Sequence, residues 1–469
     1  VDVFRAPPLI DGGRCIYQLT SSGKAFKFSP SGETLWIYSH MYGIHGAGAL
    51  MDGSLFASDH AGHVFALDTG TGAVQWRSPI SRGSFRDGFA ATLAYNGTVF
   101  VSAQVIQPRS HTIVPSAAPS PDEEKEQELT SENAQNMNIV AVSSRNGYLR
   151  WKFKLDVPCT SFMASTPGDG TIVFMDTEGT LYRLSVDRGD LVWTSVFHWL
   201  DVTRVSSTGN AVIGPNNMVY AVHKTLRAGG PGVVRAVRLS DGQAVWHRMM
   251  GEFEGNQAPA VGRLGGALAV VAGLGPSPGA PVAYQGFGRY HHLLGYLGAA
   301  AQYRVMYGVH ALSQRLGPRA ACLWRRLGYR VDFPSVVVAL DAETGELRWQ
   351  WEPPAWRRPA AAGDTELAEA RTHKSQEPGH EHVEPMCRPP PWSQPVIAAD
   401  GAVYVGHMDG HLYEIRDIDG NGVIESGTEV SSFRTGDNAT AHAFVSGATI
   451  APGMMVATPC GGEMLVFKS

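Results

Sequence analysis

Hydrophobic and polar positions alternate along this chain in short runs, and each run is followed by a turn and a second run that carries a tryptophan. Val64-Phe-Ala-Leu67 and Val336-Val-Val-Ala339 are typical, because each is followed by Asp-x-x-Thr-Gly and then by a segment containing Trp. Short apolar or alternating runs bounded by Gly-rich turns predict β-hairpins. We therefore expect an all-β protein.

The hairpin recurs six times with a Gly four positions before the Trp. Gly accepts the positive φ that a tight turn requires, and Trp on the next strand offers a large face to a neighbouring unit. Uninterrupted units are about forty residues long, which suits four short strands per unit. We predict that neighbouring units are held together by Trp36, Trp76, Trp151, Trp193, Trp246 and Trp349.

Two further units are less regular. The seventh has Ser431 where Trp is expected, and an eighth half-unit follows at Gly447–Met455 and Met464–Phe467. Val1–Phe4 is predicted to supply the outer strand that the last unit lacks, because closing the ring removes exposed sheet edges. We therefore predict a single eight-bladed β-propeller over residues 1–469, with seven blades as the alternative.

The run Ala-Leu-Asp-x-x-Thr-Gly-x-x-x-Trp, as in Ala66–Trp76, resembles the repeat of pyrroloquinoline quinone (PQQ) dehydrogenases and of their cofactor-free relatives. One such relative scaffolds outer-membrane β-barrel assembly. In a dehydrogenase, the resemblance implies an axial cofactor pocket, a disulfide between adjacent cysteines, a calcium ion on the quinone and an Asp base. Here no two cysteines are adjacent. We therefore place the chain closer to the cofactor-free members and do not expect PQQ.

Charge and cysteine content exclude some classes of function. The formal net charge of −5 is small for 469 residues and argues against nucleic acid as a partner. No uninterrupted apolar run is long enough for a membrane helix. The resemblance and the start at Val1 rather than Met favour an extracytoplasmic or organelle-lumen location. Neither a disulfide framework nor a zinc motif is indicated by the scattered residues Cys15, Cys159, Cys322, Cys387 and Cys460.

Four segments interrupt the blades. Segment 107–137 is rich in Pro, Ser and Glu, which predicts a solvated or disordered loop. Segment 353–391 is a Pro/His-rich strap, and its Gly379–Cys387 stretch gathers His and Cys without a zinc spacing. A solvated loop is favoured there over a metal site.

Segment 274–333, expected in blade six, carries the strongest local charge bias. From Gly255 to Val331 the chain has no Asp or Glu, and apolar residues from Leu293 to Leu316 recur every three or four positions, which predicts a helix. The helix would pack on the propeller rim with an exposed Arg face, or dock on an acidic protein partner or an anionic membrane surface. The candidate partner-binding residues are Arg289, Arg304, Arg315, Arg319, Arg325, Arg326 and Arg330.

Segment 417–429 is an enlarged turn in the seventh unit. It opens with Asp-x-Asp-x-Asn-Gly, as an EF-hand calcium loop does. Its twelfth position is Thr428 rather than Glu, so Glu425 or Glu429 would have to complete the shell. The alternative is an Asx/Gly turn that needs no ion. The candidate Ca²⁺ ligands are Asp417, Asp419, Asn421, Val423 through its carbonyl, and Glu425.

The sequence favours a non-catalytic scaffold, an accessory subunit that docks into a larger protein or membrane-associated assembly through 274–333. No set of nucleophile, base and acid can be assembled from spacing alone. The alternative is an enzyme that uses the propeller channel, either a PQQ-dependent alcohol or sugar dehydrogenase or a hydrolase or lyase.

Overall fold

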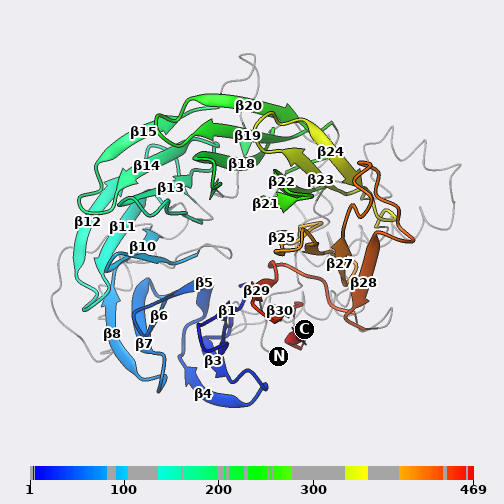
Figure 1. Ribbon diagram of the computed structural model, residues 1–469. Helices are drawn as coiled ribbons and strands as arrows, with labels where there is room; N and C mark the ends of the chain where they lie inside the picture. The colour runs from blue at the N-terminus through cyan, green and yellow to red at the C-terminus, as the bar shows by residue number, and fades with distance from the viewer. Residues whose placement is uncertain are drawn as a thin grey trace, which may run out of the picture.

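The chain forms a ring of small antiparallel sheets. All regular elements of the described residues are strands, and they form eight sheets. Figure 1 shows these sheets as blades around a common axis, so the eight-bladed prediction is confirmed and the seven-bladed alternative is wrong. The computed structural model describes residues 4, 6–81, 91–103, 136–159, 162–197, 205–206, 211–225, 231–251, 253–255, 257–276, 333–356, 390–436, 441–460 and 463–468.

The strands follow one another outwards from the axis in most blades. Blades one to four contain β1 (Leu9–Ile10), β2 (Ile16–Leu19), β3 (Lys24–Phe28) and β4 (Thr34–Ser39); β5 (Ile44–Met51), β6 (Ser54–Asp59), β7 (His63–Asp68) and β8 (Val74–Pro79); β9 (Leu93–Tyr95), β10 (Thr98–Ala103), β11 (Asn138–Ser143) and β12 (Leu149–Lys154); and β13 (Thr171–Met175), β14 (Leu181–Ser185) and β15 (Leu191–Ser195). Blades five to eight contain β16 (Val205–Ser206), β17 (Val212–Ile213), β18 (Met218–Thr225), β19 (Gly232–Arg238) and β20 (Ala244–Met249); β21 (Ala260–Leu264), β22 (Ala267–Leu274), β23 (Val336–Asp341) and β24 (Leu347–Trp351); β25 (Val396–Ile397), β26 (Val403–Gly406), β27 (His411–Ile415) and β28 (Val430–Arg434); and β29 (Thr449–Ala451), β30 (Met454–Ala457) and β31 (Leu465–Lys468).

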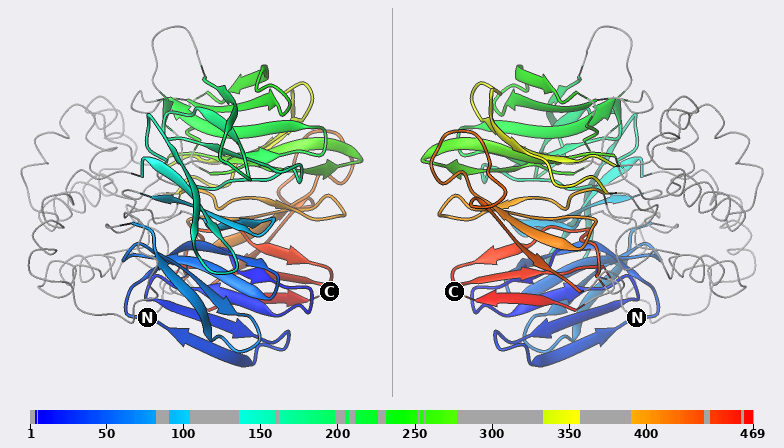
Figure 2. Two further views of the ribbon diagram at one scale, coloured as in Figure 1. Left: turned by 90° about the vertical axis from the view of Figure 1, so that its left-hand side faces the viewer. Right: turned by 90° about the vertical axis from the view of Figure 1, so that its right-hand side faces the viewer.

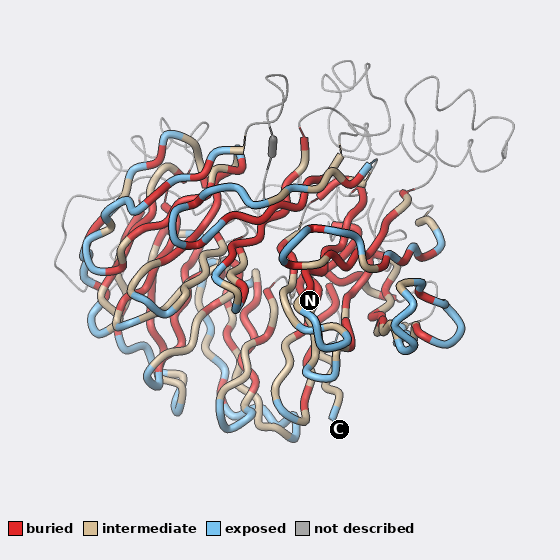
Figure 3. Tube along the Cα trace, turned by 45° about the horizontal axis from the view of Figure 1, so that its top comes forward, coloured by how far each residue is buried: buried red, intermediate tan, exposed pale blue. Residues whose placement is uncertain are grey.

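The second strands are buried along their whole length in several blades, whereas the outer strands alternate. All six residues of β6 and of β10 are buried, because both faces of these strands pack against neighbouring blades. Figure 3 shows the buried stretches inside the ring and the exposed ones at its turns. None of the described segments forms a helix with the length and apolar character needed to cross a bilayer.

A tryptophan on the outer strand of one blade lies over a turn glycine of the next. Gly189 has a φ of +73°, and a Cβ atom on it would lie 2.6 Å from Cε3 of Trp151. Only glycine leaves room for the ring. We call this contact the tryptophan lock. It occurs in the pairs Trp36–Gly72, Trp76–Gly147, Trp151–Gly189, Trp193–Gly242 and Trp246–Gly345.

Each locked indole also donates a hydrogen bond across the junction. Its Nε1 lies 2.7–3.0 Å from the carbonyl oxygen of the residue three positions before the glycine. The ring packing and this hydrogen bond fix both the distance and the register of adjacent blades. The accepting carbonyls belong to Thr69, Ser144, Val186, Leu239 and Ala342.

Blades one and eight lie side by side and close the ring (Figures 1 and 2). Thr449 Oγ1 donates to the carbonyl of Pro8 at 2.6 Å, and Ile16 of blade one packs in one apolar cluster with Met454 and Val456 of blade eight. The predicted closing strand, Val1–Phe4, lies outside the described residues except for Phe4.

The connections divide the disc into two faces. Because strands within a blade are antiparallel, the loops between second and third strands lie at the same face as the connections between blades. We call this the insertion face and the opposite one the turn face. The long inserted segments all leave the described chain at the insertion face, between Ala103 and Asn136 in blade three, between Pro276 and Phe333 in blade six, and between Trp356 and Pro390. The helix predicted within 274–333 lies outside the described residues.

Candidate functional site

The enlarged turn of blade seven connects β27 to β28 on the turn face. Gly420 and Gly422 have φ of +71° and +79°, which lets the chain bend sharply twice. The Gly422 N–H donates to Asp417 Oδ2 at 3.1 Å, and the Asn421 N–H donates to Asp419 Oδ1 at 3.0 Å. These short-range hydrogen bonds form because Asx side chains can reach backbone N–H groups a few residues on.

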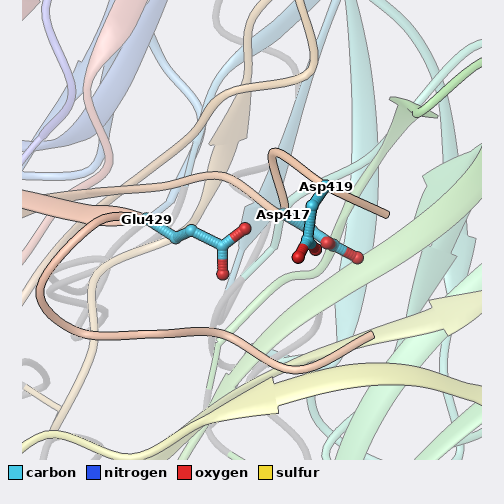
Figure 4. A group of neighbouring side chains, drawn as sticks. All are labelled: Asp417, Asp419 and Glu429. Atoms are coloured by element: carbon cyan, nitrogen blue, oxygen red, sulfur yellow. The ribbon is translucent and has the colours of Figure 1, made fainter. Parts of the chain in front are cut away.

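Three carboxylates meet inside this turn. One oxygen from each of Asp417, Asp419 and Glu429 lies within 4.8 Å of the others, and Figure 4 shows Glu429 extending towards the two aspartates. Glu429 is buried, and the N–H groups of Glu425 and Ile418 donate to it at 2.9 and 2.6 Å. These hydrogen bonds lower the pKa of Glu429 below its usual value. Asp417 Oδ1 is shielded from solvent without a hydrogen-bond partner.

The other predicted ligands have different contacts. Asn421 uses its side chain within the turn, where its Nδ2 donates to Asp419 and its Oδ1 accepts from the N–H of Val423. Glu425 accepts a hydrogen bond from the hydroxyl of Thr428 at 3.1 Å. Of the two acids that could complete a shell, Glu429 therefore lies with the aspartates, and Glu425 binds Thr428.

The turn is also part of the junction between blades six and seven. A Cβ atom on Gly422 would lie 2.8 Å from the carbonyl oxygen of Arg348 in β24. Trp351 of the same strand donates to Ser426 Oγ at 3.0 Å, and Ile424 packs in the apolar cluster that contains Trp349. The enlarged turn thus replaces the simple Gly turn that receives tryptophan elsewhere.

A polar cluster on the insertion face surrounds Asp59 at the end of β6. Its buried carboxylate lies 2.6 Å from Arg77 Nη2, 3.0 Å from His40 Nε2 and 3.1 Å from His63 Nδ1. Burial alone would raise the pKa of Asp59, but hydrogen bonds with both histidines hold it far below its usual value. Since His40 follows β4, the cluster joins blade one to blade two.

A serine, a histidine and an aspartate are connected at the base of the blade-six insertion. Ser335 Oγ lies 3.0 Å from His407 Nε2, and His407 Nδ1 lies 3.0 Å from Asp409 Oδ1. Sequence spacing could not reveal this arrangement, because Ser335 belongs to another blade. Ser335 is 1% exposed and His407 is fully buried, so neither can meet a substrate as placed. We interpret the arrangement as a structural hydrogen-bond network that links blades six and seven.

A cavity of about 210 Å³ lies where the first strands of the blades begin, at the insertion face. Residues from all eight blades line it, and no described lining residue carries a carboxylate.

The candidate partner-binding arginines, from Arg289 to Arg330, lie outside the described residues. Cys15 and Cys159 carry thiols, and the Cys159 thiol donates to the carbonyl of Met175 at 3.3 Å, whereas Cys460 is disulfide-bonded. The scattered cysteines predicted no disulfide framework, and one disulfide-bonded cysteine is seen among the described residues.

The fold and its locks define a β-propeller of the PQQ-like repeat class. A family model described as outer membrane protein assembly factor BamB matches residues 1–104 and 128–277, more than half of the chain. The chain belongs to this family. A search of curated proteins found no match.

Solved structures agree on the fold. BamB from Moraxella catarrhalis has a TM-score of 0.58 at 14% identity, with 99% of this chain and 97% of that chain covered. Quinohemoprotein alcohol dehydrogenase from Comamonas testosteroni has a TM-score of 0.55 at 10% identity, with 97% of this chain and 70% of that chain covered. The computationally designed Ika8 protein has a TM-score of 0.56 at 10% identity, with 100% and 96% covered. At these identities the likeness establishes the fold alone.

Proposed function

We propose that this protein is a non-catalytic scaffold that docks into a larger assembly through its insertion face. The observation that carries the proposal is the position of the insertions: the described ends of all three long segments lie at one face of the disc. One of these segments, 274–333, is rich in Arg in a chain whose net charge is −5. The family's assembly factor supports a role in protein assembly.

The favoured partner is an acidic protein surface, because Arg presents a planar donor fork to carboxylates and is enriched at protein interfaces. An anionic membrane surface is the other chemistry that would attract the same segment. The disulfide at Cys460 supports a location in an oxidising compartment, outside the cytoplasm or in an organelle lumen.

The proposal is tested by deleting residues 277–332 and, as a matched control, residues 107–135. Both deletions remove segments from the insertion face, but only the first removes the seven candidate partner-binding arginines. Affinity capture from native extract should lose its specific partner with the first deletion and keep it with the second. Reversing Arg325 and Arg326 to Glu should weaken capture, whereas Arg263→Glu in β21 should not.

Two outcomes would contradict this proposal. If both deletions capture the same proteins as the full chain, the basic segment is not the docking element. If the full chain sediments with phosphatidylglycerol vesicles and captures no protein, the partner is a membrane surface. Reduction of a redox dye with an alcohol or sugar, after incubation with PQQ and calcium, would instead favour the dehydrogenase alternative.

We also propose that the turn 417–429 binds Ca²⁺. The specific observation is the convergence of Asp417, Asp419 and Glu429 around a buried Asp417 oxygen that has no hydrogen-bond donor. Hard cations such as Ca²⁺ prefer carboxylate and carbonyl oxygens in this type of loop. Bound calcium would offset the repulsion between the three carboxylates and stiffen the turn that packs against β24.

Calcium binding is tested by calorimetry and by urea unfolding with Ca²⁺ or EDTA. At a calcium concentration about 100 times the dissociation constant, linkage predicts a stabilisation of about 2.7 kcal/mol. Asp417→Asn and Glu429→Gln should remove the effect, whereas Glu425→Gln should retain it. A wild-type protein with no binding heat and no stabilisation would show that the turn needs no ion.

A further inference from the structure

Among the residues that the structure describes, no tryptophan lock is seen at the junction between blades seven and eight. Ser431 stands on β28 at the position that Trp occupies in the outer strands of blades one to six, and its hydroxyl donates to Glu414 Oε2 at 3.1 Å. The indole half of the lock is therefore not seen among the described residues of this junction.

A groove of about 440 Å³ takes the place of the lock. Both blades line it, and we call it the open junction. Phe433 and Phe467 meet edge to face at its rim with ring centroids 5.3 Å apart, and Phe433 is 44% exposed. Its lining includes Tyr404, Glu414, Ser431, Phe433, Met454 and Phe467.

The chemistry of the open junction suits an indole. Aromatic rings and the thioether of Met454 make favourable contacts with an aromatic face. The Glu414 carboxylate lies beside Ser431 and can accept an indole N–H, as the turn carbonyls do at the five locked junctions. The volume exceeds that needed for one side chain and lies within the usual range of ligand pockets.

We propose that the open junction binds the tryptophan side chain of a partner polypeptide. The rest of the ring supplies the argument for this occupant, because five equivalent junctions of the same molecule are each filled by an indole that donates its N–H across the gap. The groove lies between two adjacent blades, as each of the five locked indoles does. Its lining includes the turn between β29 and β30, which lies at the turn face, so the site is separate from the docking face proposed above.

The probe is fluorine-labelled N-acetyltryptophanamide, followed by fluorine NMR so that the eleven tryptophans of the protein do not interfere. Wild-type protein should give a saturable shift with a roughly millimolar dissociation constant, as expected for a ligand that buries one side chain. N-acetylleucinamide should compete about tenfold more weakly, because it has no N–H on a flat ring.

Ser431→Trp should fill the open junction from within and abolish binding while the protein stays folded. The matched control is Gln350→Trp, which adds an indole to the exposed face of β24 and should leave binding unchanged. If Ser431→Trp fails to fold, Phe433→Ala gives a second test, since it removes one exposed ring and should weaken binding about tenfold.

Several results would overturn the proposal. One is the absence of a saturable shift with wild-type protein. Another is undiminished binding by Ser431→Trp or Phe433→Ala. Equal competition by N-acetylleucinamide would show an unspecific apolar surface. Self-association of the wild type that Ser431→Trp abolishes would identify a second copy of this chain as the occupant. None of these results depends on the insertion face.

Discussion

Gly189 and Gly32 occupy the same position in two repeats, and substituting each by Ala separates the two reasons for glycine in the lock. Both residues have positive φ, +73° at Gly189 and +93° at Gly32. Trp151 covers Gly189, whereas no atom lies within 4 Å of a Cβ placed on Gly32. The Gly32→Ala change therefore reports backbone strain alone, and Gly189→Ala adds the collision with the indole.

The expected magnitudes follow from these contacts. Placing Ala in the left-handed region costs about 1–2 kcal/mol, and this applies at both positions. At Gly189 the ring of Trp151 must also move, which costs about 1–3 kcal/mol for overpacking. The movement weakens the 2.7 Å hydrogen bond from Trp151 to the Val186 carbonyl, a further loss of about 1 kcal/mol. Gly189→Ala should therefore lower the free energy of unfolding by about 2–4 kcal/mol more than Gly32→Ala.

The assay is urea unfolding followed by circular dichroism, with the slope of each transition checked to be unchanged. Near-ultraviolet spectra should also change only in Gly189→Ala, because only that variant moves an indole. Equal destabilisation by the two substitutions would refute the claim that the turn glycine is required by the indole of the preceding blade.

Three further predictions concern buried groups. His223 is fully buried with both ring nitrogens unpartnered, and burial, with a smaller contribution from Arg235, lowers its pKa to about 3. The unfolded chain therefore binds more protons than the folded protein between about pH 6.5 and pH 3, and the free energy of unfolding should fall by about 2 kcal/mol from pH 8 to pH 5. His223→Leu should flatten this pH dependence when it is measured by urea unfolding. An unchanged pH dependence in the variant would contradict its assignment to His223. Asp59→Asn should cost about 3 kcal/mol because it leaves Arg77 and two histidines without their carboxylate, whereas the exposed pair partner Asp241→Asn should change stability little. Since the disulfide at Cys460 withdraws two of the five cysteines, DTNB should titrate three thiols in denatured protein before reduction and five afterwards; five thiols before reduction would exclude the disulfide.

The repeat made the ring predictable because its two defining residues interact with each other across blades. Gly189 and Trp151 are both visible in the sequence, and the physical requirements of positive φ and ring packing are local to them. The carbonyl of Val186 could not be predicted as the hydrogen-bond acceptor, since its position depends on how two blades are aligned.

The candidate calcium turn was predictable only in part. The spacing of Asp417 and Asp419 indicated that their oxygens would converge. Which glutamate joins them was not determined, because Glu425 and Glu429 are both close in sequence. The structure distinguishes them through the two N–H groups that hold Glu429 in the turn and through Thr428, which binds Glu425.

Contacts between distant segments could not be predicted from the sequence. Ser335 and His407 are 72 positions apart and belong to neighbouring blades, so no spacing rule connects them. The groove at Ser431 was visible only as a missing Trp. That a groove lies beside Ser431 depends also on blade eight, whose Phe467 and Met454 line the groove without filling it.

The most direct test of the scaffold proposal is hydrogen–deuterium exchange on the protein alone and in its native assembly. We predict that the assembly protects the basic segment 274–333 and the described loops beside it on the insertion face, such as 407–411, while turns on the opposite face, such as 68–72, exchange unchanged. Protection confined to the turn face, or no protection at all in the assembly, would contradict docking through the insertion face.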